Sequence, residues 1–144
     1  ISIILSFKLS QSYDRWWEAR KIWGSIVNDS RTLIIQLRTF TEQNTHDLVN
    51  SIAARQHKWT FEFGRQLRNG ASTPDEYGND AEVLKARQYH NPALFLLQKQ
   101  SAELRQLFHE KQLDRLSFLE IDKTLLRLCA SQGMAERIKS TIFP

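Results

Sequence analysis

Apolar residues recur along the chain at spacings of three and four, and no useful length of it alternates between apolar and polar positions. The first spacing places apolar side chains on one face of a helix, whereas alternation would place them on one face of a strand. The pattern therefore predicts an all-α chain. The expected helices cover residues 1–40, 47–69, 81–89, 92–110 and 114–131.

The first expected helix is unusually long. It contains no proline, and its one glycine is Gly24. At ~1.5 Å per residue it would span roughly 60 Å, which is too long for a compact single domain. Because a glycine inside a helix costs about 1 kcal/mol relative to alanine, Gly24 either marks a break or lets a neighbouring helix approach closely.

Turn and capping residues predict the other boundaries. Asn69-Gly70 ends the second helix, and residues 70–78 form the main exposed loop. Asn91-Pro92 places a proline in the first turn of the next helix, and Gly133 is expected to end the last one. The core face of the second helix is expected to hold Leu48, Ile52, Trp59, Phe63 and Leu67. That of the last helix is expected to combine some of Leu116, Leu119, Thr124, Leu125 and Leu128.

An aromatic and charged segment follows the apolar start of the chain. Residues 12–24 hold three of the four tryptophans, beside charged groups of both signs. A bilayer interface selects this composition, because the rings sit at headgroup level and the cations reach water or phosphate. A soluble helix with an aromatic core stripe is the alternative. Composition leaves both open, and no window approaches ~20 consecutive apolar residues.

One stripe of the first helix begins with apolar side chains. Ile3 and Phe7 are four residues apart and therefore stack on one face, which Ser10 and Asp14 continue. On the residues alone, Ile3 and Phe7 are expected to be core or lipid-facing side chains.

A second stripe carries two of the tryptophans. Trp16 and Trp23, seven residues apart, share a face, and Trp17 points elsewhere. The face continues through Ile26, Ser30, Leu33 and Leu37. Packing or interface anchoring explains these rings without a ligand.

The charged residues of this segment favour structural ion pairing over catalysis. Asp14 and Glu18 are like charges four residues apart, and Arg15 or Lys21 would neutralise them locally or across a subunit contact. Arg20 belongs to the same group of charges.

Charge and reactive residues narrow the function classes. The formal charge of +4 suits a surface that faces anionic headgroups or nucleic acid, but the basic residues are interleaved with 16 acids and do not choose between them. The single cysteine, Cys129, excludes an internal disulfide and is expected to be a buried helical thiol. The four histidines are isolated, and no metal, cofactor or nucleophile motif appears, so the chain is not expected to be an enzyme.

Two strings far apart in the sequence form recognisable motifs. The first is SYDRWWEARKIWG at residues 12–24, with its flanks at residues 6–8 and 27–31. The second is Gly133 to Ile138, followed by residues 140–144. Together they resemble the bestrophin family in its bacterial branch of voltage-dependent anion channel-forming proteins, which usually has a proline where Ile142 stands. The residues that match the family motifs are Asp14, Arg15, Trp16, Trp17, Glu18, Arg20, Trp23, Gly24, Glu136, Arg137 and Ile138.

The resemblance implies an all-helical ion channel subunit that assembles as a homopentamer. Residues 1–144 would form a single bestrophin-like region, with 1–20 as the end of the pore helix at the membrane interface and 21–144 as mainly cytosolic helices. Ile3 and Phe7 would belong to a hydrophobic neck, which conducts when wetted. Ala93, Leu94 and Phe95 are the candidates for a second, cytosolic constriction.

The same resemblance implies the partners and the location of the chain. Its partners would be further copies of itself, the lipid bilayer and permeating inorganic ions, in a plasma or inner membrane and with no nucleic acid. The family usually conducts chloride or other anions. For the bacterial branch, conduction of cations is the alternative. The start without methionine and the end inside a motif predict a fragment that lacks flanking transmembrane helices.

A soluble basic helical module is the alternative function. Its surface for nucleic acid or a partner helix would use Arg55, Lys58, Arg65 and Arg68, with Trp59 as a stacking platform. Such a module would lose affinity for nucleic acid steeply as salt is raised.

Overall fold

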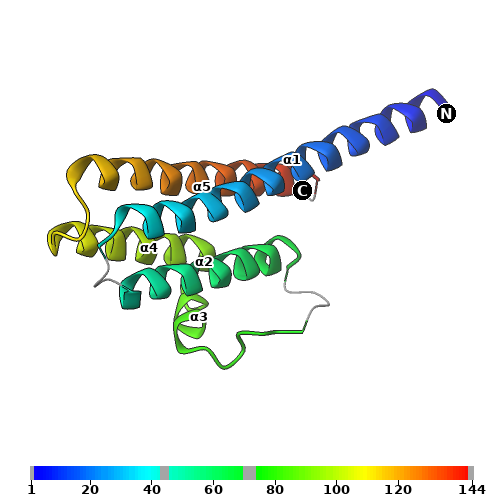
Figure 1. The fold of residues 1–144 in the computed structure, drawn as a ribbon. Coiled ribbons are helices and arrows are strands. Elements are labelled where there is room, and N and C mark those ends of the chain that lie inside the picture. The colour runs from blue at the N-terminus through cyan, green and yellow to red at the C-terminus, as the bar shows by residue number, and fades with distance from the viewer. Residues whose placement is uncertain (1, 43–45, 70–73, 143–144) are drawn as a thin grey trace.

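The computed structural model of the chain describes residues 2–42, 46–69 and 74–142, and every regular element in these ranges is a helix. The elements are α1 (Ser2–Phe40), α2 (His46–Leu67), α3 (Ala81–Ala86), α4 (Pro92–His109) and α5 (Arg115–Ile142). The four long helices run in alternate directions, with α1 along α5 and α2 along α4 (Figure 1). The short α3 packs beside α4. The prediction of an all-α chain is confirmed.

Side-chain caps begin three of these helices. Asp80 accepts a hydrogen bond from the backbone N–H of Val83 at 3.0 Å, and Asn91 accepts one from Leu94 at 3.2 Å. Asp114 likewise accepts a hydrogen bond from the N–H of Ser117 at 2.7 Å. Each cap satisfies an N–H group that has no partner within its helix. The predicted start at Asn91-Pro92 is confirmed.

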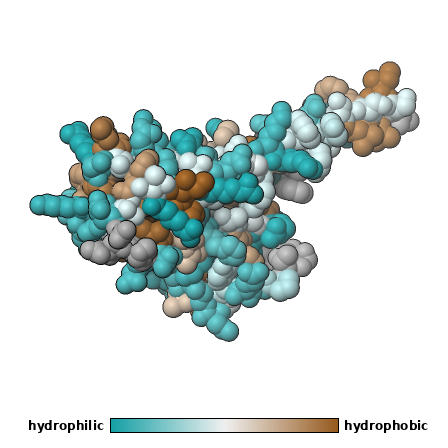
Figure 2. Space-filling model, in the orientation of Figure 1, coloured by the Kyte–Doolittle hydropathy of each residue, from teal (hydrophilic) through white to brown (hydrophobic). Residues whose placement is uncertain are grey.

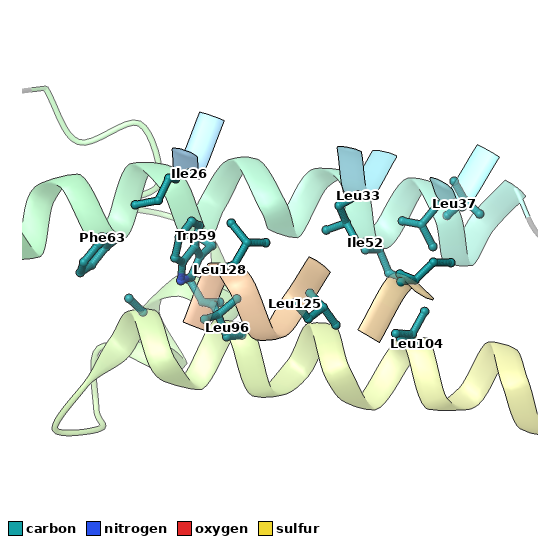
Figure 3. Close-up of a cluster of buried hydrophobic side chains, with 14 of the residues drawn as sticks. Ile26, Leu33, Leu37, Ile52, Trp59, Phe63, Leu96, Leu104, Leu125 and Leu128 are labelled. Atoms are coloured by element: carbon teal, nitrogen blue, oxygen red, sulfur yellow. The ribbon is translucent and has the colours of Figure 1, made fainter. Parts of the chain in front are cut away.

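The core lies between the four long helices (Figure 3). Its largest buried side chains include Ile26, Leu33 and Leu37 of α1, Ile52, Trp59 and Phe63 of α2, Leu96 and Leu104 of α4, and Leu125 and Leu128 of α5. Burying a side chain of this size stabilises the fold by about 1.5–3 kcal/mol. The predicted core face of α2 is confirmed, with Leu48 and Leu67 packed at its edges.

The glycines do not interrupt the long helices. The prediction that Gly133 ends the last helix is wrong, because α5 continues to Ile142. Beyond the glycine, Ala135 and Ile138 still pack against the core, which offsets a glycine penalty of about 1 kcal/mol. α1 also passes unbroken through Gly24, where no atom of the described residues beyond the local helix backbone lies within 4 Å of the position of a Cβ. Within this chain, Gly24 therefore marks neither a break nor a close helix contact.

The burial prediction for Cys129 is wrong, whereas the core face of α5 combines three of its five predicted candidates. Leu116 is 76% exposed, Leu119 is 42% exposed, and Cys129 is also exposed. The core face of α5 is set by Ile121, Thr124, Leu125, Leu128 and Gln132. At about 100° per residue, Cys129 lies about 85° from the centre of that face, and Leu119 lies on the opposite side.

Leu33 offers a direct test of this packing. It is 1% exposed, so we expect Leu33→Ala to lower the free energy of unfolding by about 2–5 kcal/mol, since the deletion leaves a cavity between α1 and its neighbours. Ile35, two residues away on the same helix, is 63% exposed, so Ile35→Ala should change it by at most about 0.5 kcal/mol. Chemical unfolding of both variants checks the difference. Equal effects would contradict the orientation of α1.

Candidate functional site

The N-terminal half of α1 projects from the helical body as an arm, defined as residues 2–21 (Figure 1). No side chain of the arm is buried, and the first buried residue of the helix is Ile22. At ~1.5 Å per residue the arm is about 30 Å long. Hydrophobic side chains gather at its outer end, whereas the visible face of the body is largely hydrophilic (Figure 2). No helix in the described residues is long and apolar enough to cross a membrane.

Ile3 and Phe7 lie on the arm and have no cover from the described part of the chain. They are 83% and 64% exposed, and Ser10 and Asp14, which continue their stripe, are exposed as well. The possibility that Ile3 and Phe7 belong to the core of this chain is therefore wrong. An apolar stripe of this kind needs another copy, another segment or lipid to cover it.

An aromatic belt, formed by Tyr13, Trp16, Trp17, Arg20 and Lys21, covers one side of the arm near its base. The Tyr13 and Trp16 ring centroids are 6.0 Å apart, and those of Trp16 and Trp17 are 6.1 Å apart. Arg20 lies 5.6 Å from the centre of the Trp16 ring, and Lys21 lies 5.7 Å from that of Trp17. Stacked cations and rings of this kind suit a surface with one apolar and one charged neighbour.

The stripe of Trp16 and Trp23 crosses from the arm into the body. Trp16 is 52% exposed, whereas Trp23 is half-buried and stacks on Phe63 at 6.4 Å. Phe63 in turn stacks on the fully buried Trp59 at 5.6 Å. The two tryptophans share a helix face, but only Trp23 is anchored in the core.

The charged motif residues of the arm lie at its surface. Asp14 and Glu18 are exposed, and Arg15 is half-buried. Arg20 and Lys21 face tryptophan rings. In the described residues, no group of three or more histidine, cysteine or acidic side chains could hold a metal ion.

Glu136, from the second motif, joins three helices. It accepts hydrogen bonds from Gln132 at 2.7 Å and from Asn91 at 3.2 Å. Gln132 also accepts a hydrogen bond at 3.1 Å from the indole N–H of Trp59 on α2. This joint was not predicted from the sequence. The one sequence signal for it was the capping pattern of Asn91. The Asn91 side chain accepts a hydrogen bond from Leu94 of its own helix and donates one to Glu136. Of the other motif residues, Arg137 is exposed and Ile138 packs at the core edge.

The three candidates for a cytosolic constriction point in different directions. Ala93 is fully buried in the core of its own chain, so it is not available to line a pore. Leu94 is 36% exposed. Phe95 is half-buried and stacks on Tyr89 at 4.5 Å, with Lys99 over the same ring at 5.5 Å.

The basic residues of α2 are engaged within the fold. Arg55 is 6% exposed and donates to Glu82 at 2.9 Å and to Glu103 at 2.5 Å. Burial lowers the pKa of Arg55, but these two carboxylates outweigh it and raise the pKa overall. Lys58 pairs with Asp80 at 3.0 Å. Since Trp59 is also fully buried, the predicted stacking surface for nucleic acid is wrong.

Arg87 forms a second charged cluster beside α2. It donates to both carboxylate oxygens of Glu62, at 2.9 and 3.0 Å, and to both of Asp75, at 2.8 and 2.9 Å. The hydrogen bonds from Arg87 lower the pKa of Asp75 to about 2, from an ordinary value of 3.8. Asp75 and then Glu62 raise the pKa of Arg87 in return. The bidentate geometry ties α3 and the segment before it to α2.

Comparison with known proteins gives one consistent family. The sequence model of the family described as "Bacterial/Fungal Bestrophin protein" matches residues 1–144. The chain is 30% identical over 149 residues to a voltage-dependent anion channel-forming protein of Ralstonia nicotianae, and 31% identical over 147 residues to one of Mesorhizobium japonicum. These alignments cover 100% of this chain but 48% and 46% of the relatives, so the chain spans about half their length.

The solved structures agree with this family. The structure of a bacterial bestrophin homologue from Klebsiella pneumoniae matches with a TM-score of 0.82 at 26% identity. The match covers 99% of this chain and 54% of the solved chain. The helical body and the arm are therefore both part of the shared fold.

We expect Asp75→Asn to remove an acid-sensitive part of the stability. Because the folded state lowers the pKa of Asp75 to about 2, its contribution is fully present above about pH 4 and is lost as the pH falls through 2. Chemical unfolding between pH 7 and pH 2 should show the largest difference from wild type above pH 4, and convergence near pH 2. Glu76→Gln, at an exposed neighbour, is the control. A difference that stays constant down to pH 2 would contradict the pairing with Arg87.

Proposed function

Because the chain belongs to the bacterial and fungal bestrophin family, we propose that it forms part of an ion channel subunit that conducts ions passively. The observation that carries the proposal is the arm of α1. It presents Ile3 and Phe7, 83% and 64% exposed, on one face with no cover from the described chain. Isolated soluble domains rarely leave apolar side chains in this arrangement without a partner.

In this proposal, five copies of the arm surround a common axis and their Ile3 and Phe7 side chains form a hydrophobic neck. An apolar ring of this kind opens when water enters it and closes by dewetting or narrowing. The stripe continues through Ser10 and Asp14, both exposed, so the pore would become polar below the neck. The pentamer, the neck and the passive mechanism are parts of one proposal, and none of them needs covalent chemistry.

The aromatic belt supports a membrane boundary near the base of the arm. Tryptophan rings with neighbouring cations are enriched where a helix leaves the hydrocarbon region. Residues 1–20 would then lie at or in the membrane, and residues 21–144 would lie mainly on the cytosolic side of a plasma or inner membrane. The buried core beginning at Ile22 agrees with that division.

The permeating ion is proposed to be chloride or another anion. The names of the relatives, which are voltage-dependent anion channel-forming proteins, support that choice. The formal charge of +4 raises the local concentration of anions, although charge steers ions more than it selects among them.

A second constriction in the cytosolic part is proposed at Leu94. Of the three neighbouring candidates, Ala93 is buried in its own chain and the Phe95 ring is stacked on Tyr89. Leu94 is the residue of the three whose side chain has the most exposed surface for a channel lining.

The neck is tested by shortening its side chains in the full-length protein. We expect Ile3→Ala with Phe7→Ala to raise ion flux into liposomes several-fold, because a wider and less apolar ring dewets less readily. The matched control is Leu5→Ala with Leu9→Ala. These leucines are 58% and 62% exposed, and each lies two residues, or about 200°, from a neck residue.

The control variant should leave flux within twofold of wild type. Size-exclusion chromatography must first show that both variants are assembled. Unchanged flux in an assembled neck variant, or the same increase in the control, would contradict the proposed pore face.

A further inference from the structure

An apolar groove lies where the arm meets the body, and the neck does not use it. Its volume is about 400 Å³, and α1, the end of α2 and the last turns of α5 form its walls. The apolar lining consists of Ala19, Ile22, Trp23, Leu67, Ala135 and Ile138. Trp16, half exposed, stands at its edge. The groove therefore opens beside the aromatic belt.

An apolar track on the arm leads toward this groove. Leu5 and Leu9 are 58% and 62% exposed, and helical geometry places Leu5, Trp16 and Trp23 within about 20° of one another. The same geometry places Leu5 about 200° from Ile3. If Ile3 faces a central axis, the track and the groove face away from it.

Both charged residues that line the groove are basic. Arg20 lies against the face of the Trp16 ring, 5.6 Å from its centre, which leaves the N–H groups at the guanidinium edge to meet an acceptor. The Lys139 ammonium donates to the carbonyl oxygen of Gln66 at 2.6 Å and to the side chain of Asn69 at 2.7 Å. These bonds hold Lys139 in place and account for two of its three donors.

We propose that this groove binds an anionic phospholipid. An acyl chain would follow Leu5 and enter the apolar groove, and the phosphate would lie between Arg20 and Lys139. The chemistry fits a lipid because the apolar track at Leu5 and Leu9 is followed along α1 by Trp16 and then by Arg20, in the order of acyl chain, interface and headgroup. Lys139 adds a second cation from α5. This inference rests on the proposed position of the arm at the membrane.

Lipid titration of the full-length oligomer tests the proposal. Delipidated protein in detergent is titrated with phosphatidylglycerol or with phosphatidylcholine, and bound lipid is counted by native mass spectrometry. We expect phosphatidylglycerol to bind at least tenfold more tightly than phosphatidylcholine. Arg20→Gln should remove most of that preference, whereas Arg31→Gln, the same change at an exposed position of α1 beyond the groove, should retain it.

A second variant separates the apolar wall from the charges. Ala135→Trp fills the groove while keeping both cations, and it should weaken the binding of both lipids by about tenfold. Circular dichroism and size-exclusion chromatography establish that each variant is folded and assembled. Equal affinity for the two lipids in wild type, or an unchanged preference in Arg20→Gln, would overturn the proposal.

Cysteine labelling distinguishes a lipid from polypeptide cover. Ala19 lines the groove, so Ala19→Cys in a Cys129→Ser background should react with a maleimide in delipidated protein and be protected by phosphatidylglycerol. A cysteine that is unreactive with and without lipid would show that another segment or subunit fills the groove, and would overturn the proposal. Ion flux is measured separately. Selective binding without flux would uphold the lipid site and contradict the channel, whereas flux without selective binding would overturn the site alone.

Discussion

The burial of one half of α1 controls the position of the other half. Ile22, Ile26, Leu33 and Leu37 are buried in the body, where α1 runs along α5. The helix has no proline and passes through Gly24 without interruption, so no common cause of a sharp kink separates the body from the arm. The contact with α5 therefore fixes the direction in which the Ile3 face, the Leu5 face and the aromatic belt point. The direction in which Ile3 points therefore depends on packing that begins about five turns away, at Ile22.

Hydrogen bonds between polar side chains determine how α5 is placed against the other helices of the body. Glu136, Gln132 and Asn91 link the last third of α5 to the start of α4, and the indole of Trp59 extends the link to α2. Such groups are satisfied only in one arrangement of the helices, because an unpaired buried polar group costs about 1–3 kcal/mol. The apolar core supplies most of the stability, and these hydrogen bonds fix how far each helix is shifted along its neighbours. They also place the second family motif at the base of the groove that faces the arm.

Several individual residues had an environment that could not be derived from their neighbours along the chain. Arg55 follows the pattern of a solvated basic helix, but two carboxylates from distant helices enclose it. Cys129 follows Leu128 in an apolar run, yet a rotation of about 100° takes it out of the core. Gly133 carries a stop signal, which the packing of Ala135 and Ile138 overrides. At Gly133 a long-range contact outweighed a local preference of about 1 kcal/mol.

The sequence by itself determined the helical class, the long first helical segment, the start of α4 at Asn91-Pro92 and the family motifs, because spacing, capping and local composition act over a few residues. It also brought Ile3 and Phe7 onto one face. Tertiary structure alone decided that this face is exposed and that α1, α2 and α5 enclose a groove. It also decided that Trp23 packs against the core whereas Trp16 stays at the surface. These features depend on which helices pack together and at what rotation, and that choice is made by contacts between residues far apart in the chain.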